Sequence, residues 1–377
     1  MKAKQVDLFF QSLVDTGVVP GISILTGRNG DILFKKEVGF KSVLPHREPL
    51  DSHTLYDLAS LTKPLVTGFL TVYLQEKKYL TLEDSVKTFF PQFPFDITIL
   101  QLLTHTSGLP PWFPFFLFGN TPDSYRDCFF SRINLETKPG KKVNYSCPGY
   151  ILLRLIIEKV SGVSYRTLAK NVIFAPLGLT DTHLSTVPEH LLARTAPTEN
   201  GNRFERKMAE NWIDKHRENY RDRLNQYAWR ETIIRGETHD LNSHHLGGTA
   251  GNSGLFASAE DVYRLSMEFF PSSASILRPE SLKPFWTNYT DFPRNPNHRS
   301  VGFKLNSSTL TAAGKALSPH AAGHTGFTGT SVWLDPQDET VFVILANRVH
   351  PEFKPINFEK VRRKIHRVLA GEIRRVA

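Results

Sequence analysis

Cysteine is scarce in this sequence of 377 residues, which contains only Cys128 and Cys147. Two cysteines cannot form the network of disulfides that stabilises small secreted domains. The chain starts MKAKQVDLFFQSLVD, with acidic and polar residues where a signal peptide would have its apolar core. These features predict a reduced, cytoplasmic protein.

Long apolar runs are also missing. No stretch approaches the roughly 20 apolar residues that a membrane-spanning helix needs, so we expect no stable membrane insertion. The formal net charge is +9, because 46 lysines and arginines outnumber 37 aspartates and glutamates. No nucleic-acid-binding motif accompanies this charge, so we expect no nucleic-acid partner. We expect solvated helix faces, with attraction of anionic substrates or surfaces as the alternative. The sequence carries no signal for a particular oligomeric state.

Strand and turn signals mark the two ends of the chain. Asn29-Gly30 separates two β-rich stretches and predicts an antiparallel hairpin. Two more strands are expected at 330–336 and 340–349, joined by a short turn. The apolar spacing in 358–373 predicts a final helix.

The middle of the chain has a different pattern. Residues 1–50 and 300–377 are expected to form one sheet-and-helix domain, whereas 51–299 is mostly helical and punctuated by glycine and proline. The helix candidates in this middle part are 61–76, 97–103, 150–160 and 259–269. The expected fold class is therefore α+β, with a helical domain inserted into a sheet domain.

A possible nucleophile lies in the segment Asp57-LASLTKPLVTGF, which contains an S-x-x-K motif at Ser60 and Lys63. Residues three positions apart share one helix face, which places the amine within reach of the hydroxyl. Pro64 cannot donate to the Ser60 carbonyl and is tolerated only in the first turn, so the helix should begin at about Ser60. The hydroxyl would then lie at the positive end of the helix dipole. An ordinary N-cap serine is the alternative, since so short a motif also occurs by chance.

Three further motifs follow in order, namely Gln101-LLTHTSGLP, Tyr145-Ser146-Cys147 and His324-Thr325-Gly326. Together with the S-x-x-K motif, they resemble the serine β-lactamase and D-Ala-D-Ala peptidase superfamily, in its class C-like branch that includes esterases and peptidases. The resemblance spans nearly the whole chain. It implies a β-lactamase/transpeptidase-like fold, with an antiparallel sheet flanked by terminal helices, a large helical insertion, and the active site between the two domains.

The resemblance also implies a mechanism. Ser60 would form a covalent acyl-enzyme, with Lys63 and Tyr145 as general acid and base. The Lys63 ammonium should lower the pKa of the Tyr145 phenol and favour its role as a base. The backbone N–H groups of Ser60 and Phe327 would form the oxyanion hole.

Other positions would contact the substrate. His324, Thr325 and Gly326 would lie on a strand beside the site, and Gly326 would let a substrate approach the backbone. His324, cationic or neutral, would bind a carboxylate or tune Tyr145. Cys147 stands where members that act on β-lactams usually have asparagine, and a thiol donates and accepts more weakly than an amide. β-Lactams are therefore disfavoured.

Two stretches resemble ligand sites without matching them. His239, Asp240, His244 and His245 lack the H-x-x-x-H spacing of helical zinc sites, so we expect no metal and no cofactor, with a substrate contact from His239 or Asp240 as the alternative. The glycine-rich stretch 247–258 lacks G-K-[ST], and we assign it a role in backbone geometry.

The substrate class stays open between alternatives. Pro110-PWFPFFLFGN is either core packing or an apolar wall of the cleft, and a wall would favour esters. Gly323-HTGFTGTSVWLDP and Ala346-NRVHP instead resemble amidases that act on muramyl-peptides. We favour a carboxylesterase-type hydrolase over an amidase or D-amino-acid peptidase acting on cell-wall peptides, and both over a non-catalytic penicillin-binding-like module. The expected partner is a small-molecule ester or peptide substrate.

Overall fold

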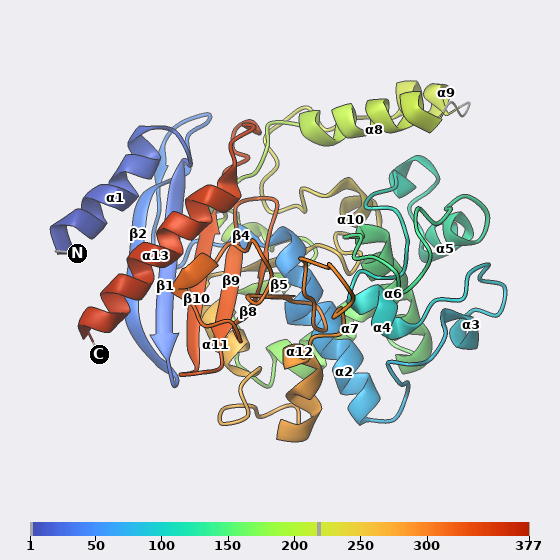
Figure 1. Ribbon diagram of the computed structural model, residues 1–377. Coiled ribbons are helices and arrows are strands. Elements are labelled where there is room, and N and C mark those ends of the chain that lie inside the picture. Colours follow the sequence, from blue (N-terminus) through green and yellow to red (C-terminus); the bar gives the residue numbers. More distant parts are fainter. Residues whose placement is uncertain (1–2, 217–219, 377) are drawn as a thin grey trace.

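The computed structural model describes residues 3–216 and 220–376. Its largest element is a seven-stranded antiparallel sheet in the order β3-β2-β1-β10-β9-β8-β7 (Figure 1). Its strands are β1 (Gly21–Arg28), β2 (Asp31–Ser42), β3 (Glu48–Pro49), β7 (Lys304–Leu305), β8 (Ala322–Thr325), β9 (Ser331–Asp335) and β10 (Thr340–Ala346). The two ends of the chain meet where β1 pairs with β10, from Ile22 opposite Ala346 to Arg28 opposite Thr340.

The hairpin and the C-terminal strand pair predicted from the sequence are confirmed. The turn between β1 and β2 consists of Asn29 and Gly30, which have φ values of 52° and 90°. Only glycine and, more rarely, asparagine or aspartate adopt this left-handed region readily, which explains the Asn-Gly pair.

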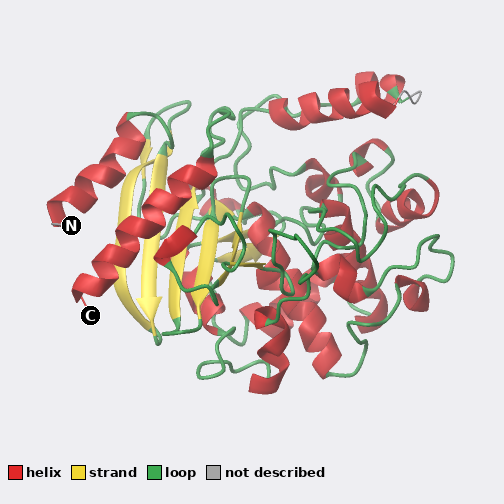
Figure 2. Cartoon of the chain, viewed as in Figure 1, coloured by secondary structure: helices red, strands yellow, loops and turns green. Residues whose placement is uncertain are grey.

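Two helices from the ends of the chain cover one face of the sheet. α1 (Ala3–Asp15) and α13 (Phe358–Val376) lie across the strands in both views of the chain (Figures 1 and 2). Phe10 and Leu369 pack there against the strand residues Ile24 and Ile344. The alternate strand residues, such as Leu25, point to the opposite face and join the larger core beneath the helical part.

The middle of the chain forms that helical part. Its helices are α2 (Phe69–Glu76), α3 (Val86–Phe89), α4 (Ile99–Leu103), α5 (Pro122–Ser131), α6 (Cys147–Ser161), α7 (Tyr165–Ala169), α8 (Arg203–His216), α9 (Arg221–Gln226), α10 (Leu241–His245), α11 (Ala259–Met267) and α12 (Lys283–Trp286). A small sheet of order β4-β6-β5 accompanies them, with strands β4 (Tyr56–Asp57), β5 (Thr182–Leu184) and β6 (Leu255–Ala257). One continuous core joins this part to the large sheet, so the division into 1–50 with 300–377 and 51–299 stays a prediction.

α8 and α9 were not among the predicted helices. Their segment is dense in charges of both signs, which obscures the apolar spacing. α8 nevertheless has an apolar face, because Ala209 and Ile213 pack against Phe116 and Leu117.

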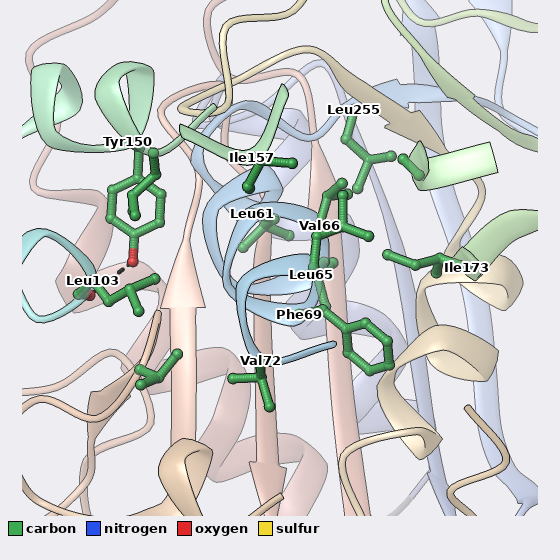
Figure 3. Packing of buried hydrophobic residues seen from close by; sticks show 14 of the residues in the cluster. Leu61, Leu65, Val66, Phe69, Val72, Leu103, Tyr150, Ile157, Ile173 and Leu255 are labelled. Atoms are coloured by element: carbon green, nitrogen blue, oxygen red, sulfur yellow. Dashed lines mark hydrogen bonds between the residues drawn. The ribbon is translucent and has the colours of Figure 1, made fainter. Parts of the chain in front are cut away.

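The segment with the S-x-x-K motif forms a central buried helix. It begins as a 3-10 turn at Ala59–Leu61, continues as a wide π-type turn at Lys63–Gly68 and leads into α2. The start agrees with the position predicted from Pro64. Side chains along this segment, such as Leu65 and Phe69, are completely buried among residues of the neighbouring helices (Figure 3). This packing fixes the backbone that carries Ser60 and Lys63.

Across residues 3–216 and 220–376, no helix has both the length and the apolar character needed to cross a bilayer. α13, with 19 residues, is strongly amphipathic: it packs one face on the sheet and exposes basic side chains such as Lys360 and Lys364.

Candidate active site

Ser60 and Lys63 are in direct contact. Lys63 Nζ donates a hydrogen bond of 2.9 Å to Ser60 Oγ and another of 3.0 Å to the carbonyl of Asn252. Cys147 Sγ lies 3.6 Å from the same nitrogen. The Lys63 side chain is completely buried, so these partners fix the position of its amine. The geometry brings together the pair predicted from the motif.

The turn before Ser60 is strained. Ala59 has a φ of 48°, in a region that residues with a Cβ rarely adopt. The buried carboxylate of Asp57 supports the turn by accepting 2.8 Å hydrogen bonds from the N–H groups of Ala59 and His239. Asp57 thus links the turn at Ala59 and Ser60 to the segment that precedes α10.

Tyr145 lies beside Lys63. The Lys63 Nζ is 5.0 Å from the centroid of the Tyr145 ring. The ring packs between His105, at 4.4 Å between centroids, and His324, at 6.0 Å. His105 Nδ1 also accepts a hydrogen bond of 3.1 Å from the N–H of Ser146, which anchors the chain next to Tyr145.

The pKa of Tyr145 is raised, because burial of the phenol outweighs the attraction of the Lys63 ammonium. The predicted lowering is therefore wrong in its net direction, although Lys63 acts in the expected sense. Burial lowers the pKa of Lys63, but Cys147 and Tyr145 raise it when they ionise, and the net shift is upward. The raised pKa of Tyr145 keeps its phenol neutral at neutral pH.

His324 is neutral. Its Nδ1 lies 2.9 Å from the carbonyl oxygen of Thr325, which can only accept, so this nitrogen carries the proton. Burial, together with the charges of Lys63 and Arg299, lowers the pKa of His324 well below its usual value. The sequence analysis allowed either a cationic or a neutral His324, and the lowered pKa favours the neutral form. A neutral His324 does not supply a positive charge for a carboxylate. Its Nε2 is a buried acceptor that has no hydrogen-bond partner among the residues that the structure describes.

Gly326 is required by packing. A Cβ at this position would lie 2.0 Å from Thr330 Oγ1 and 2.5 Å from the Leu58 carbonyl oxygen, far inside contact distance. This reason differs from the prediction that a substrate approaches Gly326. The turn after β8 lies directly against the turn that precedes Ser60.

Two hydroxyl groups join these turns. Thr328 Oγ1 donates to the carbonyl of Asp57 at 2.7 Å, and Thr330 Oγ1 donates to that of Leu58 at 2.9 Å. They connect the segment that carries Phe327 to the segment that carries Ser60. The N–H groups of Phe327 and Ser60 are the two that are expected to form the oxyanion hole.

A cavity of about 560 Å³ opens at this junction. Of the predicted site residues, Ser60, Tyr145, His324, Thr325, Gly326 and Phe327 line it. Lys63 lies behind Ser60, and Cys147 contacts Lys63 without lining the cavity. Four cationic residues also line the cavity, and the sequence analysis missed all of them: Arg299, Lys304, Arg348 and Arg362. Arg348 lies in the stretch Ala346-NRVHP but was not predicted as a site residue, and the other three lie in no motif, so that only the general excess of positive charge indicated them.

The residues considered for a metal have other partners. His239 Nε2 lies 3.0 Å from Glu199 Oε2, and His245 Nε2 lies 2.5 Å from the hydroxyl of Tyr227. His244 Nδ1 lies 3.5 Å from Glu237 Oε2. Within residues 3–216 and 220–376, no three histidine, cysteine or acidic side chains are grouped to hold a metal ion.

Asp240 contacts Lys63 only indirectly, through Asn252. Its Oδ2 accepts a hydrogen bond of 3.1 Å from Asn252 Nδ2, and the carbonyl of Asn252 binds Lys63. Neither His239 nor Asp240 lines the cavity. The glycine-rich stretch 247–258 therefore presents a backbone carbonyl to Lys63, in line with its predicted role in backbone geometry. The importance of Asn252 had no separate signal in the sequence.

The aromatic stretch after Pro110 belongs to the core. Phe113, Phe115 and Phe116 are buried in hydrophobic clusters, and none of them lines the cavity. Of the two alternatives for this stretch, core packing is confirmed, and the argument that it favours esters is lost.

Comparison with known proteins agrees with this geometry. The family model described as Beta-lactamase matches residues 6–364. A protein of Escherichia coli (strain K12) named "Putative D-alanyl-D-alanine carboxypeptidase" is 27% identical over 399 residues, which cover 95% of this chain and 86% of the relative.

Solved structures are similar over the whole chain. EstCE1, a hydrolase with promiscuous acyltransferase activity, matches with a TM-score of 0.71 and 19% identity over 98% of this chain and 97% of its own. A class C beta-lactamase matches with a TM-score of 0.72 and 19% identity over 98% and 95%. The predicted α+β, β-lactamase/transpeptidase-like fold is confirmed. The chain belongs to the beta-lactamase family and is a serine hydrolase.

Proposed function

We propose that the enzyme cleaves an amide or ester through an acyl-enzyme on Ser60, with Lys63 and Tyr145 as general acid and base. The observation that carries this proposal is the 2.9 Å contact between Lys63 Nζ and Ser60 Oγ, beside a cavity that Ser60 and Tyr145 both line. A nucleophile activated by a neighbouring base is the arrangement that covalent catalysis requires.

The reaction proceeds in two halves. Ser60 Oγ attacks the substrate carbonyl carbon, and its proton passes to the Lys63–Tyr145 pair. The oxygen of the tetrahedral intermediate accepts hydrogen bonds from the N–H groups of Ser60 and Phe327. The pair returns the proton to the leaving group as the C–N or C–O bond breaks. Water then attacks the acyl ester in the same way, releasing the acid and restoring Ser60.

Lys63 and Tyr145 titrate as a coupled pair. Burial raises the pKa of Tyr145, and the pKa of Lys63 is also raised, because the ionised forms of Cys147 and Tyr145 would together outweigh the effect of its own burial. The pair must therefore lose one proton before it can accept that of Ser60. Acylation is expected to become faster as the pH rises from neutral into the alkaline range.

The charge of the cavity supports an anionic substrate. Four cationic side chains line it, and Glu359 is its one acidic lining residue among those described. Arg299 is buried, and its guanidinium lies 5.8 Å from the centroid of the Tyr145 ring. Within residues 3–216 and 220–376, its Nε has no hydrogen-bond partner. A carboxylate would satisfy this group, because a guanidinium binds carboxylates with paired hydrogen bonds.

We therefore place the peptidase alternative before the carboxylesterase. The substrate is an acyl-peptide whose leaving group carries a free carboxylate. The name of the Escherichia coli relative, a D-alanyl-D-alanine carboxypeptidase, supports a peptide ending in D-alanine.

A matched substrate pair tests this choice. The purified enzyme is given an acyl-D-Ala-D-Ala peptide, the same peptide with a C-terminal amide, and a short-chain ester. We expect kcat/KM for the free acid to exceed that for the amide by about tenfold or more, the range of a charge-assisted hydrogen bond. Arg299→Gln should remove this preference, whereas Arg278→Gln, at an exposed arginine outside the cavity, should not. Equal rates for acid and amide, or turnover of the ester alone, would refute the peptidase proposal.

A further inference from the structure

Arg362, on α13, reaches the turn that carries Phe327. Its Nη2 donates hydrogen bonds of 2.8 Å to the carbonyl of Gly326 and 2.9 Å to that of Thr330. The side chain is 4% exposed, and its guanidinium lies 4.8 Å from the ring centroid of Phe358. A buried cation is thus aimed at the backbone of the candidate oxyanion hole.

The first of these bonds has a chemical consequence. The carbonyl of Gly326 and the N–H of Phe327 belong to the same peptide group. A donor bound to the carbonyl oxygen withdraws electron density from the nitrogen, so the N–H becomes a stronger donor. A cationic donor has a larger effect than a neutral one.

We propose that Arg362 is a positioning residue for the reaction, which orients and polarises the Gly326–Phe327 peptide so that the Phe327 N–H stabilises the oxyanion more strongly. The inference rests on the proposed acyl transfer at Ser60. Arg362 acts through the peptide and does not need to touch the substrate.

Neighbouring contacts support this role. Gly326 N–H donates to the Thr330 carbonyl at 2.8 Å, so both oxygens that Arg362 binds lie within one turn. On the following peptide, Arg348 Nε donates to the Phe327 carbonyl at 2.9 Å. Guanidinium groups therefore hold the carbonyls on both sides of Phe327.

The other oxyanion donor has a comparable but neutral arrangement. The carbonyl of Ala59, in the same peptide group as the Ser60 N–H, accepts a hydrogen bond of 2.7 Å from Thr62 Oγ1. Both peptides are thus fixed through their carbonyl oxygens, and the Phe327 peptide is fixed by a cation. Arg362 bears a full charge at neutral pH, although burial lowers its pKa to about 9.

A neutral ester separates this role from direct binding of an anionic substrate, because Arg362 also lines the cavity. With p-nitrophenyl acetate, Arg362→Gln should lower kcat by about tenfold, less than the 10²–10³-fold loss that typically follows removal of an oxyanion donor. KM for this ester should change little. Arg363→Gln is the matched control, because Arg363 also donates to a carbonyl, that of Thr311, but outside the active-site cavity. It should leave kcat unchanged.

Infrared spectroscopy measures a quantity that should not change if Arg362 had a purely structural role. A ¹³C=O-labelled acyl group on Ser60 reports the strength of the oxyanion hole through its carbonyl stretching frequency. We expect a higher frequency in Arg362→Gln than in the wild type, an intermediate one in Arg362→Lys, which keeps the charge, and no shift in Arg363→Gln. If Arg362→Gln does not fold, the same measurement on Arg362→Lys tests the proposal, because its carbonyl stretching frequency should also be higher than that of the wild type.

The outcomes separate the two proposals. Failure of the wild type to form any acyl-enzyme on Ser60 would overturn the proposed function. An acyl-enzyme whose frequency and kcat are the same in the Arg362 variants and the wild type would overturn the role of Arg362 alone. A loss confined to KM for anionic substrates would show direct binding and would also overturn it.

Discussion

Replacing Gly326 with alanine should disable catalysis while the rest of the protein stays folded. The new Cβ would lie 2.0 Å from Thr330 Oγ1 and 2.5 Å from the Leu58 carbonyl oxygen. Rotation of Thr330 relieves only the first contact, because the second involves backbone. The turn must therefore move by roughly half an ångström or more before the contact with Leu58 becomes tolerable.

That movement displaces the Phe327 N–H from the oxyanion. A displacement approaching 1 Å costs about 10²-fold in rate, so we expect kcat to fall by roughly that factor with little change in KM. Stopped-flow measurement of p-nitrophenyl acetate hydrolysis gives both parameters. The rate of Ser60 labelling by a fluorophosphonate gives the acylation step alone, and it should fall in parallel.

Gly371→Ala is the matched control. This glycine lies in α13, and a Cβ there meets no atom within 4 Å, so alanine should leave kcat unchanged and slightly stabilise the helix. Thr330→Ala added to Gly326→Ala should restore activity only in part, because the contact with Leu58 remains. Wild-type kcat in Gly326→Ala would refute the packing argument.

Three further predictions follow from the same structure. Cys147→Asn should increase nitrocefin hydrolysis above the poor rate expected of the wild type, because an amide next to Lys63 donates and accepts more strongly than a thiol; fast hydrolysis by the wild type would contradict this. Tyr145→Phe should retain only trace activity and lose the alkaline rise of kcat/KM that the raised pKa of the buried Tyr145 predicts, and an unchanged pH profile would exclude Tyr145 from proton transfer. Burial lowers the pKa of His366 to about 4, so the unfolded state binds more protons below pH ~6.5, and stability should fall by about 2 kcal/mol between pH 7 and 5. Calorimetry at both pH values should show a smaller difference for His366→Gln, and equal slopes would be evidence against this assignment.

Local signals in the sequence were sufficient for the elements that depend on local chemistry. Asn29-Gly30 predicted the hairpin because only such residues fit its turn, and Pro64 located the start of the helix that carries Ser60 and Lys63. The four ordered motifs identified the family, since each supplies a different part of one site.

Features that depend on contacts between distant segments could not be predicted. Arg299 and Arg362 reach the cavity from a loop and from the last helix, and neither lies in a motif. The pKa of Tyr145 depends on how deeply the phenol is buried, which spacing alone does not reveal. The predicted lowering by Lys63 was reasonable for an exposed pair and wrong for a buried one.

The aromatic stretch after Pro110 illustrates the same limit. Its composition fits both a core and a cleft wall, and only the packing of residues such as Phe115 against distant helices distinguishes the two. With the argument for a cleft wall lost, the cationic lining of the cavity became the basis for proposing a peptide with a free carboxylate as substrate in place of an ester.

Mass spectrometry of the intact protein, mixed with a slowly hydrolysed activated ester and then mapped by peptides, tests the central claim most directly. The account predicts a single acyl adduct on Ser60, absent in Ser60→Ala and much slower to form in Lys63→Met. An adduct on another residue, or equal labelling of Ser60→Ala, would contradict it.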